Sequence, residues 1–430
     1  MMMKSDISPN RLWTLFSKLK PKSEFSRNVL TLMTGTTIAQ AIPIAISPIL
    51  TRIYTPENFG VFAIFIAISS IFGSIANARY EQAIMLPKKD EDAINIFALS
   101  FIITIILSLL LLICVVVINN FYTELIDNKE ILFWLYFIPL SVLLTGVYNI
   151  LNYFNNRKQN YSDIANATIT KSIVSATIQL LFGLLKSGVM GLIGGQLISN
   201  FFANLKLIKN ITNEKELLFS IKKLKLIAVA KKYRNFPKYS LLAVLANTFS
   251  VHFTNILISS FYSISTLGFY SLVQRVLGMP TALIGGAIGQ VFFQEATKEK
   301  QRTGKITHTF TSTFIKLLVL GFPTFGILFF IIEDLFALVF GEEWRIAGVY
   351  AKVVIPLFFI KFISSTLSKT LIIFEKQKSE LLINLLLIST SILLLLFFNN
   401  FNQFLHYFTI CMSLNYFLFL LYYHKLSKGN

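Results

Sequence analysis

The chain has 430 residues, of which 54% are hydrophobic and only 14% are charged, and its formal net charge is +18. Soluble domains usually carry about 25% charged residues, so this composition leaves too little polar surface for a water-soluble protein. Apolar runs of about 20 residues, the length of one membrane span, recur along nearly the whole chain. The sequence therefore predicts an all-α polytopic membrane protein.

The predicted spans follow a basic N-terminal segment, residues 1–28. This segment lacks the short apolar core and cleavage site of a signal peptide. Its Leu12, Leu15, Phe16 and Leu19 have helical spacing, which predicts a helix on the membrane surface. The apolar runs then predict twelve spans, near residues 29–50, 59–78, 93–118, 131–151, 165–185, 188–208, 238–260, 266–291, 312–332, 347–370, 381–398 and 402–423.

Twelve spans place both termini on one side of the membrane, and the basic residues indicate which side. The segments on the side of the N-terminus carry 30 lysines and arginines, and the loops on the other side carry four. The four are Arg52, Lys129, Lys186 and Arg345. Because basic residues concentrate in cytoplasmic loops, we expect both termini in the cytoplasm. This bias accounts for most of the +18 charge without nucleic acid as a partner.

A long basic segment, residues 209–237, separates two bundles of six spans, residues 29–208 and 238–424, and a tail of residues 425–430 ends the chain. The apolar residues of this segment fall roughly on one helical face beside lysines: Leu217, Leu218, Ile221, Leu224 and Ile227. This pattern predicts a single amphipathic helix at the membrane interface that joins the two bundles.

The two bundles share a sequence pattern when the chain is shifted by 208 residues. Under this shift Tyr54, Phe59 and Gly60 fall on Tyr262, Leu267 and Gly268, which indicates an internal repeat. Six spans in each half give two repeats that run in the same direction.

A polar stripe with helical spacing occurs once in each half. Gln40, Ser47 and Thr51 share one face of the first span with Thr37, and the seventh span carries Thr248, His252, Asn255 and Ser259 in the same way. Polar stripes avoid lipid. Either they form hydrogen bonds between helices or they line a water-filled cavity between the halves, and we favour the cavity. His252 either bonds a neighbouring group or couples transport to protons.

Five basic residues remain after those counted on the two sides of the membrane, all within predicted spans, and the sequence places every acid in a loop or at a span edge. Lys171, Lys352 and Lys369 are predicted near span ends, where they can extend to the interface. Lys361 and Arg275 lie deeper, and charges at such depth usually mark a transport pathway. Arginine also matches the geometry of phosphate, so we expect both residues to bind an anion.

Four further charged residues stand at span ends: Arg52, Glu57, Arg79 and Glu81. They are candidates for gating or coupling, or they are interfacial residues that pair with one another.

The sequence carries no enzyme or cofactor motif. A phosphate-binding loop is absent, as is a His/Cys metal cluster, and we assign no disulfide to Cys114 and Cys411. We therefore expect no cofactor, no metal and no catalytic activity.

Several long segments in both halves carry a family resemblance: TGTTIAQAIPIAISPILTRIYTPENFGVFAIF (34–65), ARYEQAIMLPKKDEDA (78–93), YRNFPKYS (233–240), LGFYSLVQRVLGMP (267–280), VFFQEA (291–296) and GEEWRIAGVYAK (341–352). These segments resemble the oligosaccharide flippases, the Wzx-like proteins of the MOP superfamily. The resemblance implies two six-helix bundles around a cationic central cavity, with Arg275 and Arg52 as candidate cavity arginines.

The resemblance also implies a function in the bacterial inner membrane. By alternating access, such a flippase moves undecaprenyl-pyrophosphate-linked repeat units from the cytoplasmic to the periplasmic or outer face for O-antigen, capsule or similar polysaccharides. Its partners are membrane lipid and the lipid-linked oligosaccharide, with a polymerase and a chain-length regulator as further candidates. Two alternatives are a cation-coupled multidrug exporter of the same superfamily and a membrane glycosyltransferase or polymerase. The exporter would need a membrane-embedded carboxylate, and the enzyme would need catalytic acids on a large loop.

The predicted topology is testable by cysteine labelling in intact cells. A cysteine at Asn128 should react with a membrane-impermeant reagent from outside, whereas one at Lys223 should react only after the membrane is permeabilised. Reversal at either position would contradict the topology and the charge argument behind it.

Overall fold

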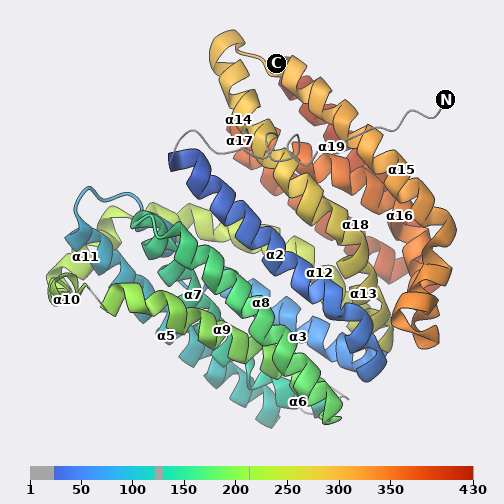
Figure 1. The fold of residues 1–430 in the computed structure, drawn as a ribbon, viewed down its shortest axis with the longest axis horizontal. Coiled ribbons are helices and arrows are strands. Elements are labelled where there is room, and N and C mark those ends of the chain that lie inside the picture. The colour runs from blue at the N-terminus through green and yellow to red at the C-terminus, as the bar shows by residue number, and fades with distance from the viewer. Residues whose placement is uncertain (1–23, 122–128, 213, 430) are drawn as a thin grey trace, which may run out of the picture.

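The structure is a computed structural model that describes residues 24–121, 129–212 and 214–429. The predicted surface helix around Leu12 to Leu19 and the labelling position Asn128 therefore lie outside the described residues. Within the described residues, all regular secondary structure is helical. Figure 1 shows the helices gathered into two groups, with the first half of the chain in blue to green and the second half in yellow to red.

The first bundle contains six long helices: α2 (Glu24–Ile53), α3 (Pro56–Ile75), α5 (Asp90–Phe121), α7 (Ile138–Arg157), α8 (Tyr161–Leu184) and α9 (Val189–Thr212). Two short helices complete it, α4 (Tyr80–Ala83) after α3 and α6 (Lys129–Leu135) before α7.

The second bundle also contains six long helical segments: α12 (Leu241–Phe261), α13 (Ile264–Pro280), α15 (Thr307–Phe340), α16 (Arg345–Leu367), α18 (Gln377–Phe397) and α19 (Phe401–Ser427). A π-helical turn, η3 (Thr281–Gly285), continues α13 into α14 (Gly286–Thr303), and α17 (Lys369–Ile373) follows α16.

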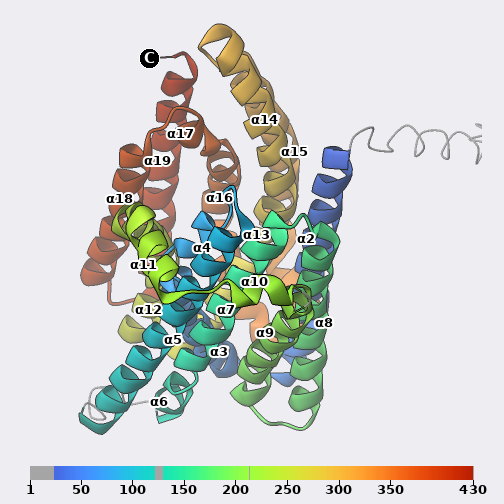
Figure 2. The same ribbon diagram turned by 90° about the vertical axis from the view of Figure 1, so that its left-hand side faces the viewer.

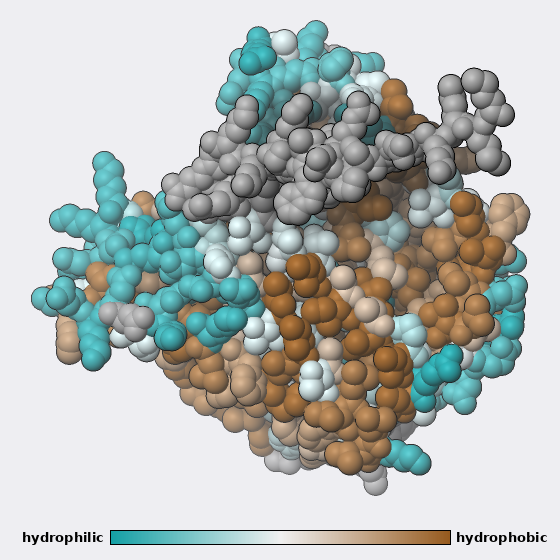
Figure 3. All heavy atoms as spheres, in the orientation of Figure 1, coloured by the Kyte–Doolittle hydropathy of each residue, from teal (hydrophilic) through white to brown (hydrophobic). Residues whose placement is uncertain are grey.

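The predicted all-α fold of about twelve membrane helices in two bundles is confirmed. Eleven helical segments among the described residues are long and apolar enough to cross a membrane. The twelfth long helix, α9, carries Gln196, Asn200 and Asn204 along its length and packs closely against α8. Hydrophobic side chains cover much of the lower surface in Figure 3, as a lipid-facing exterior requires.

The two ends of the molecule differ in charge. We call the end that holds α4, the residues between α9 and α12, the α14–α15 turn and the C-terminus the basic end. The opposite end holds the α2–α3, α8–α9 and α12–α13 turns. In Figure 2 the C-terminus and the α14–α15 turn lie at the top and α6 lies at the bottom. Among the described residues, the segments that the sequence predicts on the basic side lie at the basic end, so the bias of lysines and arginines follows the long axis of the bundles there.

The segment between the bundles forms two short helices, α10 (Lys215–Phe219) and α11 (Lys223–Lys232), where we expected one. Asn95 of α5 explains the break. Its side-chain amide donates to the carbonyl of Ser220 (3.1 Å), and its side-chain oxygen accepts from the amide N–H of Lys222 (3.0 Å). One side chain therefore satisfies backbone groups that a continuous helix would pair internally.

The repeat predicted from the 208-residue shift is present in the local geometry of both halves. Thr55 and Ser263, which correspond under the shift, both cap the helix that follows them, since each accepts a hydrogen bond from the backbone N–H three residues later. Tyr54 and Tyr262 also correspond. The Tyr54 hydroxyl donates to Gln179 of α8, and the Tyr262 hydroxyl donates to Phe398 at the end of α18, each at 2.6 Å.

The repeats contact each other through two corresponding glycines. Gly60 of α3 and Gly268 of α13 are both buried where these helices cross. A Cβ on Gly60 would collide with the carbonyl of Ile264, and a Cβ on Gly268 would collide with the carbonyl of Pro56. Because Pro56 and Ile264 are also 208 residues apart, the crossing has local two-fold symmetry. Only glycine permits this approach of two backbones.

Replacing Gly60 with alanine should therefore lower the stability of the folded protein. We expect a loss of about 1–3 kcal/mol, because the added methyl group forces the two backbones apart. Thermal unfolding in detergent measures the change. Gly194→Ala is the matched control, since nothing lies within 4 Å of a Cβ there. Equal unfolding temperatures for both variants would contradict the close crossing.

Candidate functional site

The two bundles meet in a seam near the opposite end of the molecule. Trp344, between α15 and α16, is buried, and its indole N–H donates to the carbonyl of Thr51 (2.8 Å). Its ring contacts Phe59 of α3 edge-on, with ring centroids 5.0 Å apart. The hydroxyl of Ser265 donates to the carboxylate of Glu57 across the same seam. These contacts close the space between the bundles at this end.

Arg275 extends from α13 of the second bundle into this seam. Its guanidinium donates to the hydroxyl of Ser47 on α2 (3.3 Å) and lies over the ring of Phe59 (5.7 Å to the centroid). Both partners belong to the first bundle. Arg275 therefore forms a contact between the two halves. This position gives no direct support to the expectation that it binds substrate in an open cavity.

A polar cavity of about 320 Å³ lies in the second bundle, beside the seam. We call it the His252 cavity. It is lined by Val251, His252, Asn255, Gln274, Gly278, Thr281, Ala282, Phe358 and Lys361. The side-chain oxygens of Asn255 and Thr281 are buried and have no hydrogen-bond partner among the described residues. Buried polar atoms are normally satisfied, so these two oxygens are available to a bound molecule or to water.

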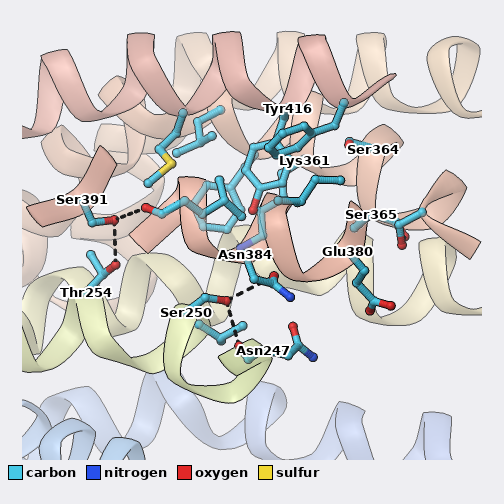
Figure 4. A pocket seen from close by; sticks show the side chains of 18 of the residues that line it. Asn247, Ser250, Thr254, Lys361, Ser364, Ser365, Glu380, Asn384, Ser391 and Tyr416 are labelled. Atoms are coloured by element: carbon cyan, nitrogen blue, oxygen red, sulfur yellow. Dashed lines mark hydrogen bonds between the residues drawn. The ribbon is translucent and has the colours of Figure 1, made fainter. Parts of the chain in front are cut away.

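A larger polar cavity of about 400 Å³ lies between α12, α16, α18 and α19, and we call it the Glu380 cavity. Figure 4 shows side chains from all four helices around it. Ser250 donates to the side-chain oxygen of Asn384 (3.4 Å), and Thr254 donates to Ser391 (3.2 Å). Lys361 lines both cavities, and its ammonium group lies 5.5 Å from the ring centroid of Phe358, which also lines both.

Glu380 is a residue that the sequence argument missed. It lies at a span edge, as expected of every acid, in the first turn of α18, and its side chain also lines the Glu380 cavity. Lys361 and Lys369 line the same cavity, which gives these three groups a formal charge of +1. A signal was present in the sequence, because Glu380 and Asn384 are four residues apart and share a helical face.

A third space, the α2 groove, lies between the two halves. It is lined from α2 by Leu32, Met33, Thr36, Thr37 and Gln40, and from η3 and α14 by Ala282, Leu283, Gly286, Ala287 and Gln290. The polar stripe on α2 thus has two environments. Thr37 and Gln40 line the groove, whereas Ser47 and Thr51 are buried in the seam.

The structure brings only some of the predicted residues together. His252, Asn255 and Lys361 share one cavity. Thr248 is half-buried on α12, and Ser259 donates to the carbonyl of its own helix at Ile256; neither is among the lining residues of the three spaces. The stripe on α12 therefore contributes two of its four members.

The predicted charged residues at span ends lie at opposite ends of the molecule. Arg52 is exposed, and Glu57 accepts from Ser265 in the seam. At the basic end, Arg79 forms an ion pair with Glu81 (3.1 Å), whose side chain is 2% exposed. Burial raises the pKa of the Glu81 carboxyl, and the charge of Arg79 opposes this shift. The backbone of Arg79 is left-handed, with φ of 65°.

The position predicted for Lys171 is wrong. It lies near the middle of α8, half-buried, and not near a span end. Its ammonium group lies 5.2 Å from the ring centroid of Tyr148 on α7, and such a cation–π contact stabilises a charge away from water. Lys352, by contrast, lies 3.8 Å from Glu333 as an ion pair.

The part of the chain that the structure describes holds no group of three or more His, Cys, Asp or Glu side chains placed to bind a metal ion. The chemistry available in the three spaces is therefore that of amides, hydroxyls, one imidazole and a few charges. These groups bind polar or charged molecules by hydrogen bonds and by charge.

The architecture is thus two bundles of membrane helices with polar cavities beside a closed seam. Solved structures with this fold include an inward-closed lipid II flippase MurJ, with a TM-score of 0.63 and 13% identity over 93% of this chain and 86% of that one. An inward-facing multidrug resistance MATE family transporter of the MOP superfamily has a TM-score of 0.62 and 11% identity, over 92% and 94% of the two chains. A MOP superfamily transporter from Pyrococcus furiosus Vc1 (DSM3638), described as having a binding pocket of reversed polarity, has a TM-score of 0.56 and 12% identity over 93% and 95%.

The chain belongs to the polysaccharide biosynthesis protein family, a family that includes flippases. The family model matches residues 49–348, which extend from the end of α2 to the start of α16. No curated protein matches the chain. The predicted family resemblance is confirmed, together with the MOP superfamily fold.

Removing the Arg275 side chain should loosen the seam. With alanine at position 275, a cysteine placed at Ser265 should react several-fold faster with a membrane-impermeant thiol reagent, because the contact to Ser47 is lost. Arg275→Lys should give an intermediate rate, since it keeps the charge but loses the planar fork. Arg345→Ala is the control, because Arg345 bonds only to Glu342 and Asp334 of its own bundle among the described residues. Unchanged reactivity in Arg275→Ala would remove this residue from the seam.

Proposed function

We propose that the protein is a flippase for lipid-linked oligosaccharides. It moves undecaprenyl-pyrophosphate-linked repeat units from the cytoplasmic to the periplasmic or outer face of the inner membrane, for O-antigen, capsule or similar polysaccharides. The observation that carries this proposal is the His252 cavity, which places Lys361 beside unpaired amide and hydroxyl oxygens next to a closed seam. Family membership supports a role in polysaccharide biosynthesis.

The cavity chemistry suits a sugar headgroup. A sugar that crosses hydrocarbon loses hydrogen bonds to water, and each lost bond costs a few kcal/mol. The side chains of His252, Asn255, Gln274 and Thr281 replace water as hydrogen-bond partners. Lys361 adds a positive charge for the pyrophosphate. The polyprenyl chain needs no such replacement, because it stays in lipid throughout.

The position of the seam supports alternating access. The contacts of the seam lie near the opposite end of the molecule, and the α2 groove and the His252 cavity lie on the side of the seam that faces the basic end. The charge distribution assigns the basic end to the cytoplasm. The structure is then a state closed to the outside, and transport requires the seam at Trp344 and Arg275 to open while the basic end closes.

The cation-coupled multidrug exporter remains the second candidate function, and Glu380 is the observation that favours it. A coupling cation would need a carboxylate within the membrane, and Glu380, at the edge of the α18 span, is a carboxylate that lines a cavity. Two lysines line the same cavity, however, so its charge favours anions. The family membership and the transporter fold also favour transport over the third candidate, a membrane glycosyltransferase or polymerase.

We also propose where the protein lies in the cell and which molecules it contacts. We place the protein in the bacterial inner membrane with both termini in the cytoplasm. Membrane lipid and the lipid-linked oligosaccharide are its direct partners, and a polymerase and a chain-length regulator are further partners in assembly. Arg79 and Glu81, at the cytoplasmic end in this topology, are candidates for gating or coupling.

Neutralising Lys361 should weaken binding of the substrate headgroup. We expect Lys361→Gln to lower the affinity of the purified protein for a polyprenyl pyrophosphate by about tenfold, with a larger effect at low salt, where screening is weakest. Lys352→Gln on the same helix is the control, because Lys352 is paired with Glu333. If both variants bind the lipid as the wild type does, Lys361 has no part in substrate binding.

Transport should respond to the membrane potential, because the substrate is anionic. A potential that is negative inside contributes about 2.3 kcal/mol per charge per 100 mV toward export. In vesicles with a fixed pH gradient, collapsing the potential should slow outward movement of the lipid-linked repeat unit. A rate that follows only the pH gradient would contradict this drive and would assign the coupling to a titrating group, His252 or Glu81.

A further inference from the structure

One face of α11 is apolar, exposed and without a partner among the described residues. Leu224 is 83% exposed and Ile227 is 57% exposed, and Ala228 is exposed beside them. These three residues follow the spacing i, i+3, i+4, so they form one stripe along the helix. We call it the α11 stripe. Large apolar side chains that are this exposed indicate a surface that a membrane or another protein covers.

The other face of α11 is fixed to the first bundle. Val229 is 5% exposed, and the backbone carbonyl of Ala230 accepts a hydrogen bond from the Tyr80 hydroxyl (3.0 Å). Lys225 forms an ion pair with Glu91 (2.6 Å). Glu91 lies in the first turn of α5, a membrane span. The helix is therefore held at the level where a span enters the membrane, with its stripe facing away from the bundle.

Lysines border the α11 stripe on both sides. At about 100° per residue, Lys223 and Lys232 fall on opposite flanks of the stripe, and Lys231 lies at its C-terminal end. All three are exposed. Lysine side chains in this position extend their charges to the headgroups while their aliphatic parts stay in the apolar layer. An exposed phenylalanine, Phe219 of α10, adds to the apolar surface just before this helix.

We propose that α11 lies in the plane of the membrane and binds the anionic lipid headgroups of the leaflet at the basic end. Its apolar stripe enters the boundary of the acyl chains, and its lysines contact acidic headgroups. Charge complementarity favours this surface over a protein partner, because lysines flank the stripe on both sides and no acidic residue lies within α11. The proposal is independent of the transported substrate.

This contact has a consequence for the joint between the two bundles. Only Tyr233, Arg234 and Asn235 separate α11 from the π-helical turn η2 (Phe236–Ser240), which leads directly into α12. A lipid-bound α11 therefore fixes the entry of the second bundle relative to the leaflet. The lipid composition of that leaflet becomes a factor that biases the movement of one bundle against the other.

Fluorescence quenching on the full chain in vesicles tests the proposal. After Cys114 and Cys411 are replaced by alanine, a probe is attached to a cysteine at Leu224 or, as control, at Glu216, an exposed polar position on α10. In vesicles with anionic lipid, a quencher carried on the acyl chains should reach the Leu224 probe at least threefold better than the Glu216 probe. Iodide present on both sides should show the reverse order.

The charge dependence is tested by a variant with Lys222, Lys223, Lys231 and Lys232 all changed to glutamine. In the chain that keeps these lysines, the Leu224 probe should be less protected from iodide in purely zwitterionic vesicles than in vesicles with anionic lipid. In the variant, protection should be the same in both kinds of vesicle.

Two outcomes overturn the proposal. Iodide reaching the Leu224 and Glu216 probes equally means that the stripe faces water, and protection of the Leu224 probe from both quenchers means that protein covers it. An unchanged unfolding temperature confirms that the variant is folded, since the Lys225–Glu91 pair is retained.

Discussion

The contact of two backbones at Gly60 and Gly268 is the constraint on which the rest of the structure depends. It sets the distance between α3 and α13, and this distance allows Trp344 to reach Thr51 and Arg275 to reach Ser47. Since the contact is nearly symmetric, each half supplies the same element to it. A symmetric pivot of this kind suits two bundles that move against each other, because neither half must deform for the other to turn.

The polar groups of the second bundle are subject to a different physical constraint, because a polar group exposed to lipid costs free energy. Lys361 lines two polar cavities, with amide and hydroxyl groups around it in place of lipid. A charge in such a site is stabilised by polar neighbours and by any anion that enters. In the proposed flippase, the seam at the opposite end would limit access to these groups to one side, so that a headgroup could cross without an open pore.

Much of the fold was predictable, because apolar length, the bias of basic residues and the 208-residue shift are local or periodic signals. The sequence also identified Lys361, His252 and Asn255, which share a cavity. It did not predict that Arg275 contacts Ser47, because the two residues are 228 positions apart and the contact depends on how the bundles dock. Nor did it reveal the helix break at Ser220, which depends on the tertiary partner Asn95. Lys171 was misplaced for a simpler reason: the helix α8 begins about four residues earlier than the predicted span.

The central claim, that the protein carries lipid-linked repeat units outward, is tested most directly by depleting it and measuring on which face of the inner membrane these units lie. We expect them to accumulate on the cytoplasmic face, protected from an enzyme or lectin added outside, and we expect the wild-type protein but not the Lys361→Gln variant to restore their exposure. Repeat units that reach the outer face at the normal rate in depleted cells would contradict the claim.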